Sequence, residues 1–61
     1  MSNGMDLKVR RIRARITQQQ VADRVGLSRS WVAKIERQDK VAVDVIGKYV
    51  TALDALQGEA S

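Results

Sequence analysis

The hydrophobic positions of this chain are most regularly spaced between residues 17 and 37, TQQQVADRVGLSRSWVAKIER, and they predict two short helices joined by a turn. The apolar residues are Val21, Ala22 and Val25 in the first segment and Val32 and Ile35 in the second. Their spacing gives each helix one side to bury. Gly26 separates the segments where a helix can end in left-handed backbone, which glycine adopts at least cost.

Polar residues at the starts of both segments support this prediction. Thr17 can N-cap the first helix, and Gln20, three residues on, completes a capping-box pattern. Ser28 is a favourable N-cap for the second helix. The positions of the second helix that do not face the core are Arg29, Ser30, Ala33, Lys34 and Arg37. The pattern therefore predicts a helix-turn-helix unit whose second helix exposes a polar and basic face.

One more helix is predicted on each side of this unit. The first runs from Asp6, a candidate N-cap, to about Ala14, and Leu7 lies off its apolar face. Its expected core positions are Met5, Val9, Ile12 and Ile16. The last helix is expected to start with Asp44 as its N-cap, although Gly47 weakens its interior by about 1 kcal/mol relative to Ala. The apolar residues of that helix are Val45, Ile46, Tyr49, Val50, Leu53 and Leu56.

The domain organisation predicted from these elements is simple. Residues 1–5 are expected to form a flexible arm, residues 6–57 a single helical domain, and residues 58–61 a frayed tail. A chain of 61 residues is near the lower size limit for a self-supporting core.

Composition excludes several classes of function. The chain has no Cys and no His, so a zinc site would have only carboxylate ligands, and no acid–base pair for an enzyme is evident. No apolar run approaches the length of a membrane helix or of a signal-peptide core. We therefore expect a non-enzymatic cytoplasmic protein without metal or cofactor, and without a membrane partner.

The charge is unevenly distributed. The net charge is +4, but residues 8–40 contain ten basic and three acidic residues, a local +7, whereas residues 41–61 contain one basic and three acidic residues, a local −2. A basic chain can simply have a solvated charged surface. Concentration of the positive charge around a helix-turn-helix unit instead favours a phosphate-binding face.

Six residues of the unit match a known motif in register and without a gap: Gln18, Ala22, Gly26, Val32, Ile35 and Glu36. Their pattern resembles the DNA-binding unit of the phage-repressor/Cro-type, or lambda-repressor-like, helix-turn-helix family. A weaker similarity extends from about Leu7 to Leu53. The resemblance implies an all-α fold, with four helices in this chain and without the fifth helix that the family usually has.

The resemblance also implies an ion pair between the first helix and the recognition helix. Ungapped counting makes Arg11 the partner of Glu36, while the apolar face of the first helix favours Arg13, and we prefer Arg11. The pair would hold the two helices together. The family tends to have glycine where this chain has Arg15 and Gln38, which puts both turns in question because other residues resist positive φ.

The DNA contacts that the resemblance implies divide into two groups. Arg29, Ser30 and Ala33 are the candidates for base contacts, with Arg29 suited to guanine O6 and N7, although a phosphate contact is the alternative for Arg29. The candidates for phosphate contacts are Thr17, Gln18, Lys34 and Arg37. Trp31 falls on the same side as Ile35, so we expect it to pack in the core rather than stack on a base.

The implied function is that of a sequence-specific regulator of transcription in a bacterium or a phage-infected host. Its helix 29–37 would read the major groove of double-stranded DNA, as a homodimer on a palindromic operator. Without a fifth helix to cover them, the expected dimer contacts are Tyr49, Leu53 and Leu56. Two alternatives remain: an antitoxin that represses its own operon and binds a toxin, and a protein-interaction module without DNA binding.

Overall fold

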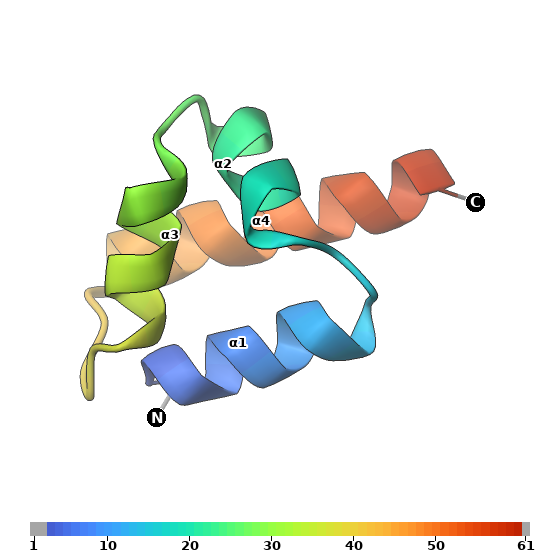
Figure 1. Cartoon of the computed structure of the whole chain (residues 1–61). Helices are drawn as coiled ribbons and strands as arrows, with labels where there is room; N and C mark the ends of the chain where they lie inside the picture. The colour runs from blue at the N-terminus through green and yellow to red at the C-terminus, as the bar shows by residue number, and fades with distance from the viewer. Residues whose placement is uncertain (1–2, 61) are drawn as a thin grey trace.

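The computed structural model describes residues 3–60, which form four α-helices and no strand. The helices are α1 (Gly4–Arg13), α2 (Gln18–Val25), α3 (Arg29–Glu36) and α4 (Val43–Ala60). α2 and α3 form the predicted helix-turn-helix unit. In this view α4 passes behind them and α1 lies below them (Figure 1). α2 packs on α3 and α4, and α1 packs on the same two helices. The predicted all-α, four-helix fold is confirmed for the described residues.

The helix-turn-helix unit forms as its polar positions predict. Thr17 caps α2: its Oγ1 accepts the N–H of Gln20 at 3.1 Å, and its own N–H donates to Oε1 of Gln20 at 2.8 Å. Gly26 ends α2 in left-handed backbone with φ of 76°. Ser28 caps α3 by accepting the N–H of Trp31 at 3.2 Å. These predictions are confirmed.

A single hydrophobic core lies where the four helices meet. Its buried residues are Leu7, Ile16, Val21, Ala22, Val32, Ile35, Val41, Tyr49, Ala52 and Leu53. Trp31 is half-buried and packs against this core, as expected. The apolar sides predicted for α2 and α3 therefore face inward together.

The predicted core side of α1 is wrong. Three of the four expected core residues are exposed: Met5, Val9 and Ile12. The residues that face inward are Gly4, Leu7 and Arg11. Only Ile16 is buried as expected, and it lies beyond the end of the helix. The prediction of this side failed because it followed the spacing of apolar residues alone, whereas the inward side of α1 includes Gly4 and Arg11, and Arg11 is buried against the carboxylate of Glu36.

α1 also begins earlier than predicted, so the expected arm and cap are corrected. Asn3 is the N-cap: its Oδ1 accepts the N–H of Asp6 at 2.8 Å, and Asp6 accepts the N–H of Asn3 at 3.3 Å. Asp6 is the third residue of the helix rather than its cap. Residues 3–5 thus belong to α1 and its cap, while residues 1 and 2 of the expected arm lie outside the described residues.

The bounds of α4 differ from the prediction at both ends. The N–H of Ile46 donates to the carbonyl of Ala42 at 2.9 Å, and the helix begins at Val43. Asp44 therefore lies in the first turn of the helix and not at the N-cap. A negative charge in the first turn still stabilises the helix through its dipole. The helix continues to Ala60, so the expected tail is helical to that point, and residue 61 lies outside the described part of the chain.

The predicted dimer contact is also corrected. Tyr49 and Leu53 are 0% and 1% exposed within the single chain, and Leu56 is half-buried against the same core. The prediction failed for Tyr49 and Leu53 because it left them uncovered, whereas α1 and α2 both pack on α4. Tyr49 and Leu53 are therefore not accessible to a second folded subunit, whereas the role of Leu56 in a dimer contact stays a prediction.

The turn after α1 holds Arg15 in left-handed backbone, with φ of 59°. Arg15 is the only non-glycine residue with positive φ in the region that the structure describes, so Gln38 does not adopt this conformation. A residue with a Cβ is less stable in left-handed backbone by about 1–2 kcal/mol. The first of the two turns is therefore locally strained.

We expect Arg15→Gly to stabilise the domain by about 0.5–1 kcal/mol, since relief of the strain exceeds the entropy that glycine adds to the unfolded chain. The melting temperature should rise by about 2–8 °C in a domain of this size. Arg15→Ala is the matched control, because it removes the same charge but keeps the strain. Equal melting temperatures for the Gly and Ala variants would contradict this account.

Candidate nucleic-acid interface

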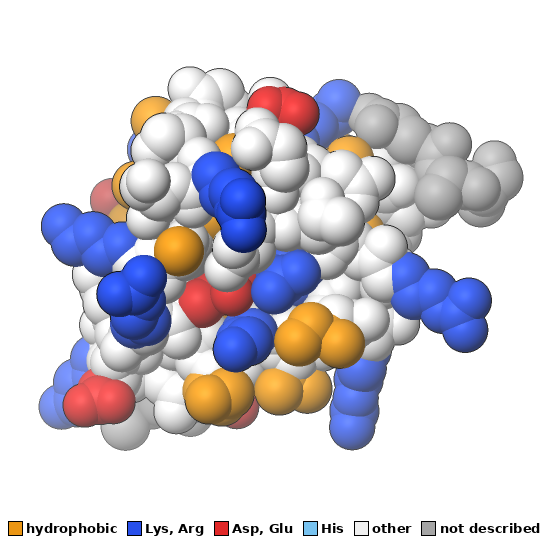
Figure 2. All heavy atoms as spheres, in the orientation of Figure 1, with side chains coloured by type: hydrophobic (Ala, Val, Ile, Leu, Met, Phe, Trp, Pro, Cys, Tyr) orange, Lys and Arg blue, Asp and Glu red, His pale blue; other side chains and the backbone are white. Residues whose placement is uncertain are grey.

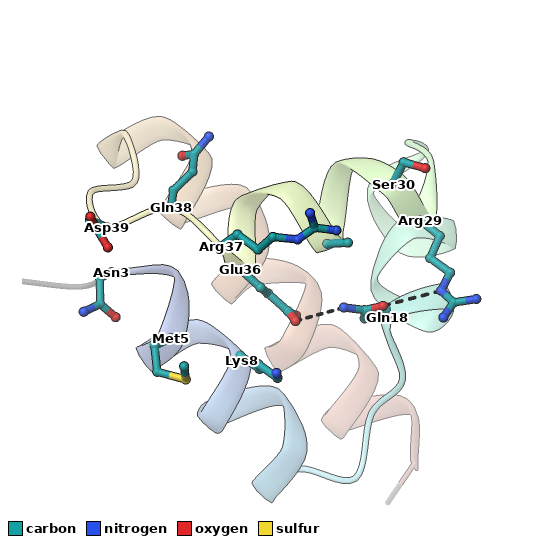
Figure 3. Close-up of a pocket in the computed structure, with 11 residues that line it drawn as sticks. Asn3, Met5, Lys8, Gln18, Arg29, Ser30, Glu36, Arg37, Gln38 and Asp39 are labelled. Atoms are coloured by element: carbon teal, nitrogen blue, oxygen red, sulfur yellow. Dashed lines mark hydrogen bonds between the residues drawn. The ribbon is translucent and has the colours of Figure 1, made fainter.

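A groove of about 680 Å³ runs between α1, the start of α2 and α3 (Figure 3). α3 contributes Arg29, Ser30, Ala33 and Arg37 to its lining. Asn3, Met5 and Lys8 form the opposite wall, and Gln38 and Asp39 close the end near the α3–α4 loop. Gln18 lies at the start of α2, beside Arg29, and Glu36 lies between the two walls.

Helical spacing explains why these α3 residues share the groove. Arg29, Ala33 and Arg37 recur every four residues, so they lie along one side of the helix. Val32 and Ile35 occupy the opposite side and are buried in the core. The structure thus gathers five of the predicted contact residues at one groove: Gln18, Arg29, Ser30, Ala33 and Arg37. Lys34 is exposed on the same helix and does not line the groove.

Glu36, which lines the groove, forms a buried ion pair with Arg11. Glu36 is 6% exposed and Arg11 is 9% exposed. Nε of Arg11 donates to Oε2 of Glu36 at 2.7 Å, and Nη2 donates to Oε1 at 3.3 Å. Nη1 of Arg11 donates to the carbonyl of Ile16 at 2.8 Å, which ties the turn after α1 to the same site. Arg11 is therefore the partner of Glu36 in the structure, and Arg13 is exposed.

Glu36 is ionised at neutral pH in this environment. Burial alone would raise the pKa of its carboxyl group, but the hydrogen bonds from Arg11, Tyr49 and Gln18 together outweigh burial and hold that pKa below its ordinary value. Tyr49 donates its hydroxyl hydrogen to Oε2 of Glu36. Burial and this bond both raise the pKa of the Tyr49 hydroxyl, which stays protonated. Every described buried polar side-chain atom has a hydrogen-bond partner.

Gln18 connects this buried site to the recognition helix. Its Nε2 donates to Oε1 of Glu36 at 3.0 Å, and its Oε1 accepts from Nε of Arg29 at 3.4 Å (Figure 3). Arg29 and Glu36 are the first and last residues of α3. A single side chain from α2 thus forms hydrogen bonds with the side chains of both the first and the last residue of α3.

Comparison with known families gives a family assignment. The model of a family described as a helix-turn-helix domain matches residues 4–60. The chain belongs to this helix-turn-helix family. No curated protein and no solved structure gave a significant match. The assignment covers all four described helices and supports DNA as the partner of the domain. The match does not distinguish the phage-repressor or Cro type from other helix-turn-helix proteins.

Three basic side chains of this helix-turn-helix domain line the groove: Lys8, Arg29 and Arg37. Lys and Arg side chains are spread over the face that carries α1 and α3, and hydrophobic side chains lie among them over α1 (Figure 2). Residues 8–40 carry the ten basic side chains that give this part of the chain its local +7. A surface of this kind attracts a polyanion.

A second hollow of about 590 Å³ lies at the amino end of α2. It is lined by Thr17, Gln18 and Gln19 from this end, and by Arg15 and Arg29 from either side. The helix end offers backbone N–H groups, and the two arginines add positive charge, which suits a phosphate group. Thr17, which does not line the main groove, therefore lies at a second part of the same basic surface.

The contribution of α1 to the groove was not predicted from the sequence. Lys8 and Met5 line the groove because α1 turns Gly4 and Arg11 toward α3. The one pattern that could have indicated this is the i, i+3, i+7 spacing of Gly4, Leu7 and Arg11. That spacing is recognisable only if an arginine is accepted as an inward-facing residue.

The described residues contain neither a candidate metal site nor a candidate membrane helix. No cluster of His, Cys, Asp or Glu there could hold a metal ion. None of the described helices combines the length and the hydrophobicity that a membrane crossing requires. The groove around α3 remains the best-formed candidate site.

Proposed function

We propose that the protein is a sequence-specific regulator of transcription, of the phage-repressor or Cro type, and that α3 enters the major groove of double-stranded DNA. The supporting observation is the arrangement of α3: Arg29 and Ser30 are exposed in its first turn, and Ala33 follows one turn later on the same groove. In helix-turn-helix proteins the first residues of the recognition helix reach base edges. Its site of action would be the cytoplasm of a bacterium or an infected host.

The side chains divide into two roles under this proposal. Arg29 donates to O6 and N7 of a guanine, Ser30 donates to a neighbouring base or phosphate, and Ala33 contacts a thymine methyl group. The residues that hold the DNA backbone are Thr17, Gln18, Lys34 and Arg37. The hollow at the start of α2, lined by Thr17 and Gln18, supports their phosphate role, and the groove supports a common binding face for Arg29, Ser30, Ala33 and Arg37.

Replacing Arg29 with Ala should relax specificity at one base pair of each half-site, because a bidentate contact to guanine contributes about 1–3 kcal/mol of discrimination. Binding titrations on a preferred duplex and on duplexes with single base-pair changes would measure it. Equal weakening on preferred and random DNA would instead make Arg29 a phosphate contact.

Replacing Lys34 or Arg37 with Ala should weaken binding to all duplexes alike. Each lost phosphate contact should reduce the slope of log affinity against log salt concentration by about 0.9. Lys48→Ala is the matched control, since Lys48 lies on α4 and lines a different hollow, with Gly47 and Thr51. An unchanged slope in the Lys34 or Arg37 variant would remove that residue from the phosphate contacts.

We also propose that two copies bind a palindromic operator, because one α3 offers few base contacts. Two-fold symmetry would place the two copies of α3 about 34 Å apart, one turn of DNA. Tyr49 and Leu53 are buried, so the subunits would meet through other side chains. The large hydrophobic residues that remain exposed are Met5, Val9, Ile12, Leu27 and Val43.

A further inference from the structure

We propose that the exposed apolar side of α1 is the surface through which two copies of this chain meet on DNA. This side, called the α1 stripe from here on, consists of Met5, Val9 and Ile12, which are 57%, 41% and 53% exposed. The proposal rests on the DNA-binding function proposed above, and it assigns the subunit contact that a palindromic operator requires.

The α1 stripe has the pattern of a buried surface, but its own chain does not bury it. Its residues follow i, i+4, i+7 spacing, so they lie along one side of the helix. α1 packs on α3 and α4 through a different side, which carries Leu7 and Arg11. Figure 2 shows hydrophobic side chains next to one another over α1. Adjacent exposed apolar side chains on so small a domain indicate a surface that a partner covers.

Charged residues border the α1 stripe differently on its two sides. At about 3.6 residues per turn, Lys8 lies on one side of the stripe, and Asp6 and Arg13 lie on the other. The hollows agree with this placement. Lys8 and Met5 line the groove beside α3, whereas Asp6, Val9 and Arg13 line a separate hollow of about 350 Å³. The stripe thus separates the DNA-binding groove from a side that carries charges of both signs.

A second copy is complementary to this surface when the two α1 helices run antiparallel across a two-fold axis at Val9. Val9 then meets the partner's Val9, and Met5 packs beside the partner's Ile12. Position 6 lies level with position 12 of the other copy, so Asp6 comes next to the partner's Arg13, and symmetry repeats this pair. Both the apolar and the charged parts of the surface are therefore self-complementary, as a two-fold contact requires.

The same axis turns both grooves to one side. It lies in the contact plane and perpendicular to the helices, so the Lys8 side of one α1 lies beside the Lys8 side of the other. The two grooves that Lys8 lines then face the same direction, as binding to one duplex requires. The two Lys8 side chains repel one another in the free protein, and nearby DNA phosphates offset that repulsion.

The contact is too small to hold two copies together without DNA. A stable interface contains about 20–30 residues from each partner, whereas the α1 stripe supplies three large apolar side chains. We therefore expect a monomer in solution and cooperative binding of two copies to a palindromic duplex.

Binding titrations on two duplexes test the contact. One duplex carries a single half-site of the operator that selection from random DNA identifies, and the other carries both half-sites. Val9→Gln should bind the single half-site like the wild-type protein, because Val9 lies outside the groove. On two half-sites it should lose about tenfold in cooperativity, since both copies lose an aliphatic side chain from the contact. Leu27→Gln is the matched control: Leu27 is 43% exposed but lies after α2, and its variant should keep full cooperativity.

A cysteine at the axis tests the geometry directly. The wild-type chain has no Cys, so Val9→Cys carries a single thiol. Residue 9 of two closely packed helices would lie within the Cα–Cα range of a disulfide, about 4.4–6.8 Å. Oxidation on the palindromic duplex should give a covalent dimer of Val9→Cys and none of Leu27→Cys. Absence of the covalent dimer from Val9→Cys would overturn the proposal.

Charge reversal tests the antiparallel arrangement. Asp6→Arg alone or Arg13→Asp alone would bring like charges together across the contact, and each should reduce cooperativity by about threefold. The double variant restores opposite charges and should recover cooperativity. Asp6→Arg and the double variant both lose the bond from the N–H of Asn3 to Asp6, so this loss does not explain a difference between them. A double variant no more cooperative than Asp6→Arg would contradict the pairing.

These outcomes are distinct from failure of the proposed function. A wild-type protein that binds neither duplex would overturn the DNA-binding function, and the subunit contact with it. Normal half-site binding with full cooperativity in Val9→Gln would overturn the α1 contact alone. Cooperativity that is lost in Leu56→Gln and kept in Val9→Gln would assign the contact to α4 instead.

Discussion

Replacement of Glu36 with Ala should lower the unfolding free energy by about 3–5 kcal/mol, the usual loss when one side of a buried ion pair is removed. The guanidinium of Arg11 would stay inside the fold without the carboxylate that now accepts from its Nε and Nη2. At about 0.05–0.15 kcal/mol per residue, a domain this small has only about 3–9 kcal/mol in total. We therefore expect the variant to be largely unfolded at 25 °C when its circular dichroism is measured.

Asp54→Ala provides the control for this experiment. It removes a carboxylate from an exposed position of α4, and its effect should stay within about 0.5 kcal/mol. If Glu36→Ala melted at the wild-type temperature, the ion pair would contribute nothing to the fold. That result would contradict a stabilising role for the polar contact between α1 and α3.

Replacement of Gly4 with Ala should also destabilise the domain strongly, by about 1–3 kcal/mol or more. The added Cβ would overlap the carbonyl oxygen of Ile35 and lie 2.6 Å from the backbone of Glu36. These are backbone atoms at the end of α3, so they cannot rotate away as a side chain could. The N–H of Gly4 also donates to the carbonyl of Gln38 at 2.8 Å, which fixes α1 at this crossing. Thermal unfolding would measure the loss.

Gly47→Ala is the matched control for Gly4→Ala. A Cβ at Gly47 meets no atom within 4 Å, and the residue lies inside α4. This variant should be more stable than the wild-type protein by about 0.5–1 kcal/mol, because alanine is the better helix former. Similar effects of the two substitutions would show that the close approach of α1 to α3 does not limit stability.

The helix-turn-helix unit was predictable because local chemistry determines most of it. Thr17 with Gln20, Gly26 and Ser28 set the ends of α2 and α3, and each acts on neighbours within a few residues. The apolar residues of these two helices then had only one way to face a common core. In this segment, local preference and tertiary packing agree.

α1 was mispredicted because its inward face depends on residues far away in the sequence. Leu7 and Arg11 turn inward since Glu36, twenty-five residues after Arg11, supplies a buried carboxylate. Gly4 permits the close crossing with α3. Hydrophobic periodicity contains no information about either contact, and it instead selected Met5, Val9 and Ile12, which are exposed.

The α3 residues of the candidate site were predictable from the sequence, but the hydrogen bonds that join α3 to the other helices were not. Helical spacing from Ser28 onward places Arg29, Ser30 and Ala33 outside the core. The bond from Gln18 to Glu36 joins residues eighteen positions apart, and it depends on the angle between α2 and α3. The same holds for Tyr49, which was expected at a subunit contact and instead donates to Glu36.

Selection of bound sequences from random duplex DNA tests the central claim, that the groove around α3 reads DNA sequence, most directly. We predict enrichment of one short motif that occurs twice with two-fold symmetry, its half-sites centred about one helical turn apart. The enrichment should be lost at one base pair of each half-site in Arg29→Ala. Recovery of unenriched sequences by folded wild-type protein, or the same motif from Arg29→Ala, would contradict the claim.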